Sequence, residues 1–223
     1  MANSELGLFD TSVGKKAVMA VSGALLLGFV FSHMAGNLLI FKGQAAMDGY
    51  AQGLRELLGG AGIWVARLGL IAAVAAHVWS AIALTKQNNA ARPVGYRQTA
   101  NKRSTAASRS MFYGGITILL YIVYHIAHLT FGVTAPGEYV DGAVYARVVD
   151  SFQEEWIVSV YLVAQVCLGL HLYHGAWSFM QSLGISHPRF NHYRNIFAVG
   201  FATVTCLGFA IVPIAVYAGV VVK

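Results

Sequence analysis

Five long apolar stretches, separated by shorter polar segments, dominate the chain. They cover about residues 17–41, 63–85, 111–133, 156–180 and 195–219. Each reaches the roughly 20 apolar residues that a helix needs to cross the hydrocarbon core of a bilayer. The pattern predicts an all-α membrane protein with five transmembrane helices that form one domain over residues 1–223. The connecting segments 42–62 and 134–155 are long enough to hold short interfacial helices.

The composition supports this class and excludes several others. Hydrophobic residues make up 57% of the 223 residues and charged residues only 11%, against roughly 25% charged residues in soluble domains. The apolar stretches leave no room for a soluble catalytic domain, and the polar start followed by a full-length span is not typical of a cleavable signal peptide. The two cysteines, Cys167 and Cys206, lie inside predicted helices without a C-x-x-C or C-x-x-C-H pattern. We therefore expect neither a covalently attached haem nor an iron–sulfur cluster in this chain.

Basic residues gather on one side of the predicted topology. The N-terminal segment and the segments 86–110 and 181–194 hold ten of the 15 basic residues, whereas seven of the nine acidic residues lie on the other side. Because Lys and Arg are enriched in cytoplasmic loops, the N-terminus is expected to be cytoplasmic. Topology thus explains the net charge of +6, and no nucleic-acid partner is expected. The basic face is suited to dock an acidic partner protein, through Arg92, Arg97, Lys102, Arg103, Arg109, Arg189 and Arg194.

Histidines lie near the middle of four different apolar stretches, at His33, His77, His125 and His171. An ionisable side chain at membrane depth is costly and generally marks a functional site. The helical rise places His33 and His125 nearer the outer face and the other two nearer the cytoplasm, in layers on the order of 10 Å apart. Two pairs of imidazoles at matched depths are what two stacked haem b groups need as axial ligands. Such six-coordinate haems carry electrons, because they have no open coordination position.

Other interpretations of these histidines are open at this stage. A single buried histidine is more often a hydrogen-bonded core residue than a ligand, and two facing imidazoles can also hold copper or zinc. Metal sites and membrane proton relays commonly recruit carboxylates as well, and no Asp or Glu lies at the centre of an apolar stretch. His128 and His174 each follow a candidate ligand by three residues, about 60° around the helix. They are expected to bond a propionate, a neighbouring side chain or a quinone.

Four segments around the histidines carry a resemblance to a known family. They are FVFSHMAGNLLIF at His33, AAHVWSAIALTKQNN at His77, ITILLYIVYHIAH at His125 and GLHLYHGAWSFMQSLGI at His171. In their order and spacing the chain resembles, over nearly its whole length, the five-helix di-haem cytochrome b anchors of bacterial succinate:quinone oxidoreductases. These enzymes are succinate dehydrogenases or fumarate reductases.

This resemblance implies that His33 and His125 bind an outer haem b, and His77 and His171 an inner one, in agreement with the depth pairing. It implies two cytoplasmic partners, a flavoprotein subunit with FAD and an iron–sulfur subunit, with the chain itself anchored in the bacterial cytoplasmic membrane. Electrons would pass between succinate and menaquinone, and the chain would hold no dicarboxylate catalytic site. Some family members carry a glutamate two residues before the ligand of the fourth helix, proposed to conduct protons; this chain has Gly169 there.

Contacts for the haem propionates and the quinone are expected near the helix ends. Ser22 and Lys86 lie at the height of the inner haem and are candidate propionate partners. Asn37 and Glu56 are candidate contacts for a quinone near the outer haem. An inner quinone site, lined by Trp79, Trp177 and His174, is the alternative. The competing functions are a quinone-reactive cytochrome b of a hydrogenase or formate dehydrogenase, and a small transporter without cofactor.

Overall fold

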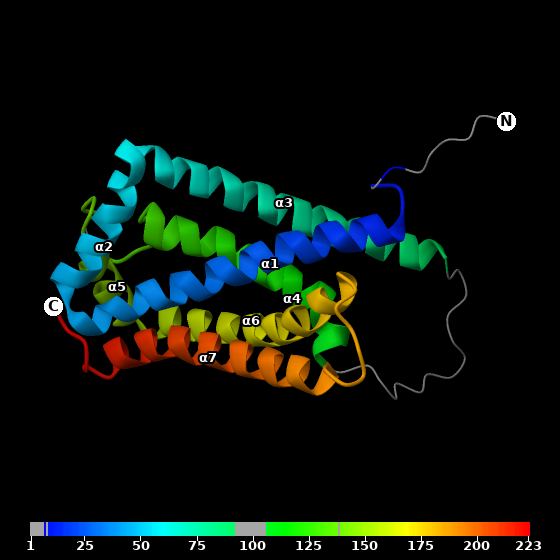
Figure 1. Ribbon diagram of the computed structural model, residues 1–223. Coiled ribbons are helices and arrows are strands. Elements are labelled where there is room, and N and C mark those ends of the chain that lie inside the picture. Colours follow the sequence, from blue (N-terminus) through cyan, green and yellow to red (C-terminus); the bar gives the residue numbers. More distant parts are fainter. Residues whose placement is uncertain (1–6, 8, 92–105, 138) are drawn as a thin grey trace.

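The computed structural model describes residues 7, 9–91, 106–137 and 139–223. Five of its helices are long and apolar enough to cross a membrane, and they lie side by side as a bundle (Figure 1). They are α1 (Ser12–Asn37), α3 (Ala61–Ala90), α4 (Ala106–His125), α6 (Glu155–Ser182) and α7 (Asn191–Tyr217). Regular structure in the described ranges is entirely helical. The prediction of an all-α, multi-pass membrane protein is thus confirmed.

Local chemistry explains where several of these helices begin and end. The Thr11 hydroxyl accepts a hydrogen bond from the backbone N–H of Gly14 at 3.0 Å, which caps the start of α1. The C-terminal end of α1 continues into a 3₁₀ turn, η1 (Leu38–Lys42). A π-helical turn, η3 (Ile126–Thr130), extends α4. The chain reverses before α3 at Gly59 and Gly60, with φ of +64° and +89°, values that glycine adopts without strain.

Two short helices close one end of the bundle, where the C-terminus also lies (Figure 1). They are α2 (Gln44–Glu56), which is followed by the turn η2 (Leu57–Gly60), and α5 (Val144–Phe152). Both fall inside the connecting segments that were expected to hold short helices, which confirms that prediction. We call this end of the molecule the α2–α5 end.

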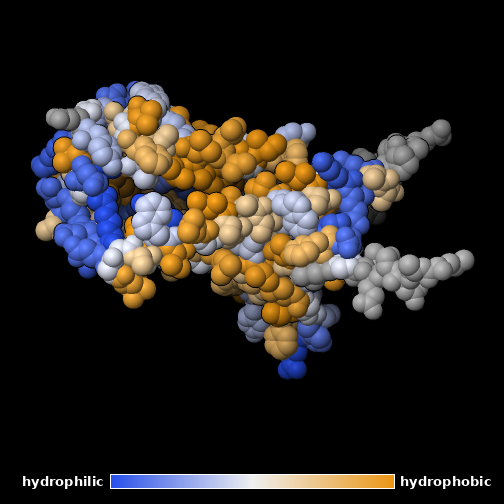
Figure 2. Space-filling view, turned by 90° about the horizontal axis from the view of Figure 1, so that it is seen from above, coloured by the Kyte–Doolittle hydropathy of each residue, from blue (hydrophilic) through white to orange (hydrophobic). Residues whose placement is uncertain are grey.

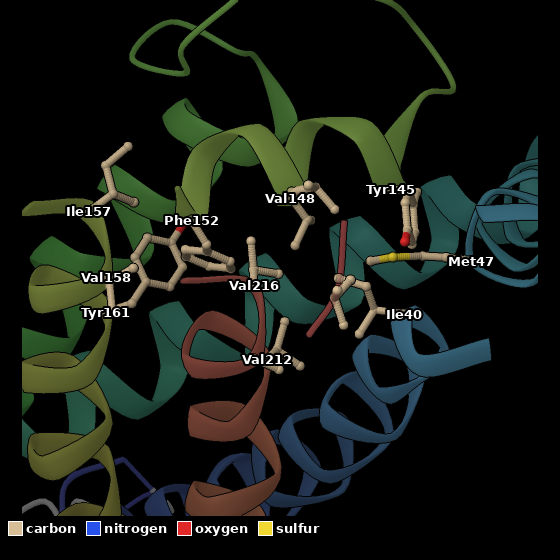
Figure 3. Close-up of a cluster of buried hydrophobic side chains, with 13 residues drawn as sticks. Ile40, Met47, Tyr145, Val148, Phe152, Ile157, Val158, Tyr161, Val212 and Val216 are labelled. Atoms are coloured by element: carbon tan, nitrogen blue, oxygen red, sulfur yellow. The ribbon is translucent and has the colours of Figure 1, made fainter. Parts of the chain in front are cut away.

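A cluster of buried hydrophobic side chains lies at the α2–α5 end, where α2, α5, η1 and the ends of α6 and α7 meet (Figure 3). Val149 and Ile157 are completely buried in it, and Phe152 and Tyr161 are almost so. Residues of α5 supply much of this core, because the helix presents an apolar face to the bundle. The core fixes the ends of α6 and α7 relative to η1.

The long helices expose apolar side chains between two polar ends, and Figure 2 shows this apolar belt on one face of the molecule. A belt of this kind matches a lipid environment, in which outward-facing apolar side chains lose nothing by exposure. Packing inside the bundle is uneven. In their most apolar stretches a third of the residues of α6 and of α7 are buried, but none of those of α4. Most side chains of α4 are therefore partly or fully exposed, and α4 packs mainly against α6.

Candidate functional site

Two pairs of histidine rings meet inside the bundle, each pair contributed by two helices. His33 of α1 and His125 of α4 have ring centroids 5.8 Å apart, at an interplanar angle of 82°. His77 of α3 and His171 of α6 have centroids 6.1 Å apart, at 64°. These are the pairings expected from depth. All four side chains are only partly buried, although they lie on the inward faces of their helices.

The His77–His171 pair lies in a cradle formed by two glycines of the other two helices. A Cβ atom on Gly23 of α1 would lie 3.3 Å from Cε1 of His77, and one on Gly115 of α4 would lie 3.7 Å from Cε1 of His171. Four helices thus surround this pair, and α1 and α4 each approach it with a glycine. The Nδ1 atom of His171 is buried and has no hydrogen-bond partner among the described residues. Buried polar atoms are normally bonded, so this nitrogen indicates room for a group outside the chain.

Aromatic rings surround the His33–His125 pair. Phe29 stacks on His33, with centroids 5.4 Å apart and an interplanar angle of 10°, and Phe209 of α7 lies 5.8 Å from the same ring. On the other side, Nδ1 of His125 is 3.2 Å from the hydroxyl oxygen of Tyr161. This pair lies nearer the α2–α5 end, because both histidines are close to the helix ends that reach it.

Three helices give the same spacing between the two pairs. In each of these helices, a residue at one histidine pair lies ten residues from a residue at the other pair. The three couples are Gly23 and His33 in α1, Gly115 and His125 in α4, and Tyr161 and His171 in α6. Ten residues of α-helix rise about 15 Å. This spacing is larger than the separation on the order of 10 Å expected from depth alone, because each depth was counted from an approximate helix end.

The geometry suits a metal centre with two axial imidazoles. A metal bonded to one nitrogen of each of two facing imidazoles, at about 2.0 Å, holds the ring centroids roughly 6 Å apart, close to both observed separations. No group of three or more His, Cys, Asp or Glu side chains suited to a metal ion occurs in the described part of the chain. Each pair would therefore supply two ligands only, and a planar tetradentate macrocycle such as haem would supply the other four. Gly23 and Gly115 keep side chains at these two positions away from the His77–His171 pair.

Ser22 and Lys86, the candidate propionate contacts, occupy different environments. Ser22 is buried beside His77: its hydroxyl donates to the backbone oxygen of Val18 at 2.7 Å and lies 3.5 Å from Nδ1 of His77. The contact that the structure gives Ser22 is therefore with the imidazole itself. Lys86 is exposed, in the last turns of α3.

Asn37 and Glu56, the candidate quinone contacts, both lie toward the α2–α5 end. Asn37 is the partly buried last residue of α1, and Glu56 is the exposed last residue of α2. Glu56 accepts a hydrogen bond from the Gln52 side chain at 2.7 Å. No hydrogen bond joins Asn37 to Glu56, which are both among the described residues. The structure therefore does not bring these two side chains together into one polar site.

The basic residues proposed as a docking surface do not all reach the surface. Arg92, Arg97, Lys102 and Arg103 lie outside the described residues, and Arg109 and Arg189 are exposed. The expectation for Arg194 is wrong, because its side chain is only 5% exposed. Its guanidinium donates to Ser186, to Asn191 and to the backbone oxygen of Trp177, and lies over the Trp177 ring at 4.7 Å. Arg194 therefore ties the start of α7 to the end of α6, and it covers Trp177 of the alternative inner quinone site.

Sequence reasoning missed Tyr161, which contacts both His125 and His128. His128 is completely buried and lies in the π-helical turn η3, its ring stacked on Tyr124. Tyr161 lies ten residues before His171, just as Gly23 and Gly115 lie ten residues before His33 and His125. This repeated spacing is the signal in the sequence that could have indicated Tyr161.

No protein-family model, curated protein or solved structure matches the chain.

Proposed function

We propose that this chain is the membrane-anchor cytochrome b subunit of a succinate dehydrogenase, with two haem b groups held by His33 and His125 and by His77 and His171. One observation carries the proposal: two histidine pairs, each bridging two helices with ring centroids about 6 Å apart, lie at two heights of one apolar bundle. The choice among di-haem cytochromes rests on the resemblance of the four histidine segments to the anchors of succinate:quinone oxidoreductases.

Haem held by the two histidine pairs would supply one-electron redox chemistry. The chain's own residues hold the four imidazoles at fixed depths on rigid helices. Phe29 and Phe209 screen the His33–His125 pair with apolar rings. Apolar helices surround both pairs, and a low-dielectric surrounding is one of the protein's means of setting a redox potential.

The charge pattern supports a direction for the electron path. With the N-terminus cytoplasmic, the His77–His171 pair is the inner one and the His33–His125 pair the outer one. A cytoplasmic iron–sulfur subunit, with a flavoprotein subunit carrying FAD behind it, would dock near the inner pair. Arg109 and Arg189 are exposed basic residues of that face. Electrons from succinate would pass from the inner to the outer haem.

Menaquinone is the proposed acceptor, at a site near the outer pair and the α2–α5 end. Asn37 and Glu56 lie toward that end and supply an amide and a carboxylate. A quinone takes up two protons with its two electrons, so an exposed carboxylate such as Glu56 is suited to take protons from solvent and pass them to the quinone. Since no hydrogen bond joins the two side chains, each is proposed as a separate contact.

The deciding experiment is purification of the chain with its associated subunits, followed by a pyridine haemochrome assay and a redox difference spectrum. We expect two haem b per chain, an associated flavoprotein and iron–sulfur subunit, and reduction of the haems by succinate. Absence of haem would refute the proposal and leave a transporter. Two haems that respond to hydrogen or formate, but not to succinate, would instead identify the cytochrome b of another dehydrogenase.

A further inference from the structure

The hydroxyl of Tyr161 lies between two histidines of α4 and its π-helical extension. Its oxygen is 3.2 Å from Nδ1 of His125 and 2.9 Å from Nδ1 of His128. Tyr161 is only 5% exposed and His128 is completely buried, so water cannot replace either contact. The π-helical turn at Ile126–Thr130 brings His128 to the same hydroxyl that His125 reaches.

The protons of this triad can be assigned once His125 is a metal ligand. A hydroxyl has one proton, so it can donate to one of the two Nδ1 atoms and must accept from the other. If Nε2 of His125 bonds the iron, its proton is on Nδ1, and that N–H donates to the Tyr161 oxygen. The Tyr161 hydroxyl then donates to Nδ1 of His128. His128 in turn carries its proton on Nε2, a buried atom without a hydrogen-bond partner in the described structure.

We propose that Tyr161 is the positioning residue of the outer haem site: its hydroxyl, polarised by His128, fixes the ring of His125 and strengthens it as a ligand. This inference rests on the proposed function. A partner that accepts the second ring proton of a ligating histidine fixes its tautomer and orientation and raises its basicity. The hydrogen bond onward to His128 makes the Tyr161 oxygen a better acceptor, because consecutive hydrogen bonds polarise one another.

The inner pair has no equivalent arrangement. Nδ1 of His77 faces the Ser22 hydroxyl at 3.5 Å, at the limit of a hydrogen bond, and that hydroxyl already donates to Val18 at 2.7 Å. Nδ1 of His171 has no partner among the described residues. The effect of Tyr161 is therefore expected at the outer haem alone. A more basic axial ligand favours the ferric over the ferrous state, so the triad lowers the midpoint potential of that haem.

The test is Tyr161→Phe in the purified complex, with the potential and the electron paramagnetic resonance signal of each haem as readouts. The outer haem is first identified as the one lost in His33→Leu. In Tyr161→Phe we expect its midpoint potential to rise by about 59 mV, the equivalent of a tenfold change in relative affinity for the two redox states, and its low-spin signal to shift. The inner haem should keep both values. His128→Leu should move the outer haem in the same direction by less.

Tyr145→Phe is the matched control. Tyr145 belongs to the same buried core as Tyr161 (Figure 3), and its hydroxyl donates to the backbone oxygen of Val222 at 2.8 Å, away from both histidines. Loss of the outer haem in Tyr161→Phe but not in Tyr145→Phe would support the inference. An unchanged outer potential and signal, or equal changes in Tyr145→Phe, would overturn it. Absence of haem from the unsubstituted protein would instead refute the proposed function.

Discussion

Replacing Gly23 by valine is expected to remove the haem proposed at the His77–His171 pair and to leave the one proposed at the His33–His125 pair in place. The new Cβ would lie 3.3 Å from Cε1 and 3.5 Å from Nδ1 of His77. Carbon atoms pack best at about 3.5–4.0 Å, so the Cβ alone requires the ring to move by roughly 0.2–0.7 Å, and the two further methyl groups of valine increase this displacement. Disturbing the residues that support a metal ligand typically lowers metal affinity about ten- to hundredfold. Each factor of ten in affinity corresponds to about 1.4 kcal/mol of binding free energy.

Gly28 provides the control, because it lies on the same helix, is exposed, and has no atom within 4 Å of a Cβ built on it. Haem content is measured by pyridine haemochrome assay and the remaining haem is identified by its redox titration. We expect about one haem per chain in Gly23→Val and two in Gly28→Val. Two haems with unchanged potentials in Gly23→Val would show that no cofactor depends on the position of His77. Equal loss in both variants would point to a general effect on α1.

Three further predictions concern the histidine pairs, Arg194 and Glu56. His33→Leu and His77→Leu should each abolish one haem and retain the other, visible as the loss of one wave in a redox titration; simultaneous loss of both would contradict separate sites. Arg194→Met should lower the unfolding temperature in detergent, because it removes the hydrogen bonds of the guanidinium to Ser186, Asn191 and Trp177, each typically worth about 0.5–1.5 kcal/mol, whereas Arg189→Met, at an exposed position, should not. Glu56→Gln should slow turnover with menaquinone while both haems and activity with an artificial acceptor stay intact, and unchanged turnover would exclude Glu56.

The sequence by itself determined the class of the protein and the depths at which its four central histidines lie. Length and hydropathy define the five spans, because a bilayer of fixed thickness demands a minimum apolar length. The constant rise of an α-helix converts residue number into depth, so the partners of His33 and His77 could be deduced without knowing where the helices lie. Short helices in the two long connections were also predictable, because these connections lie outside the five spans and are long enough to form helices of their own.

Only the tertiary structure decided which side chains face the histidines. Lipid is as apolar as a helix interface, so a membrane helix needs no polar outer face, and its apolar pattern does not show which side faces inward. Gly23 and Gly28 are equivalent in the sequence, yet only Gly23 lies against His77. Arg194 belongs to a basic segment but is buried by contacts with α6. Tyr161 reaches His125 and His128 because α4 packs on α6 and then continues as a π-turn, an arrangement set by contacts between segments more than 30 residues apart.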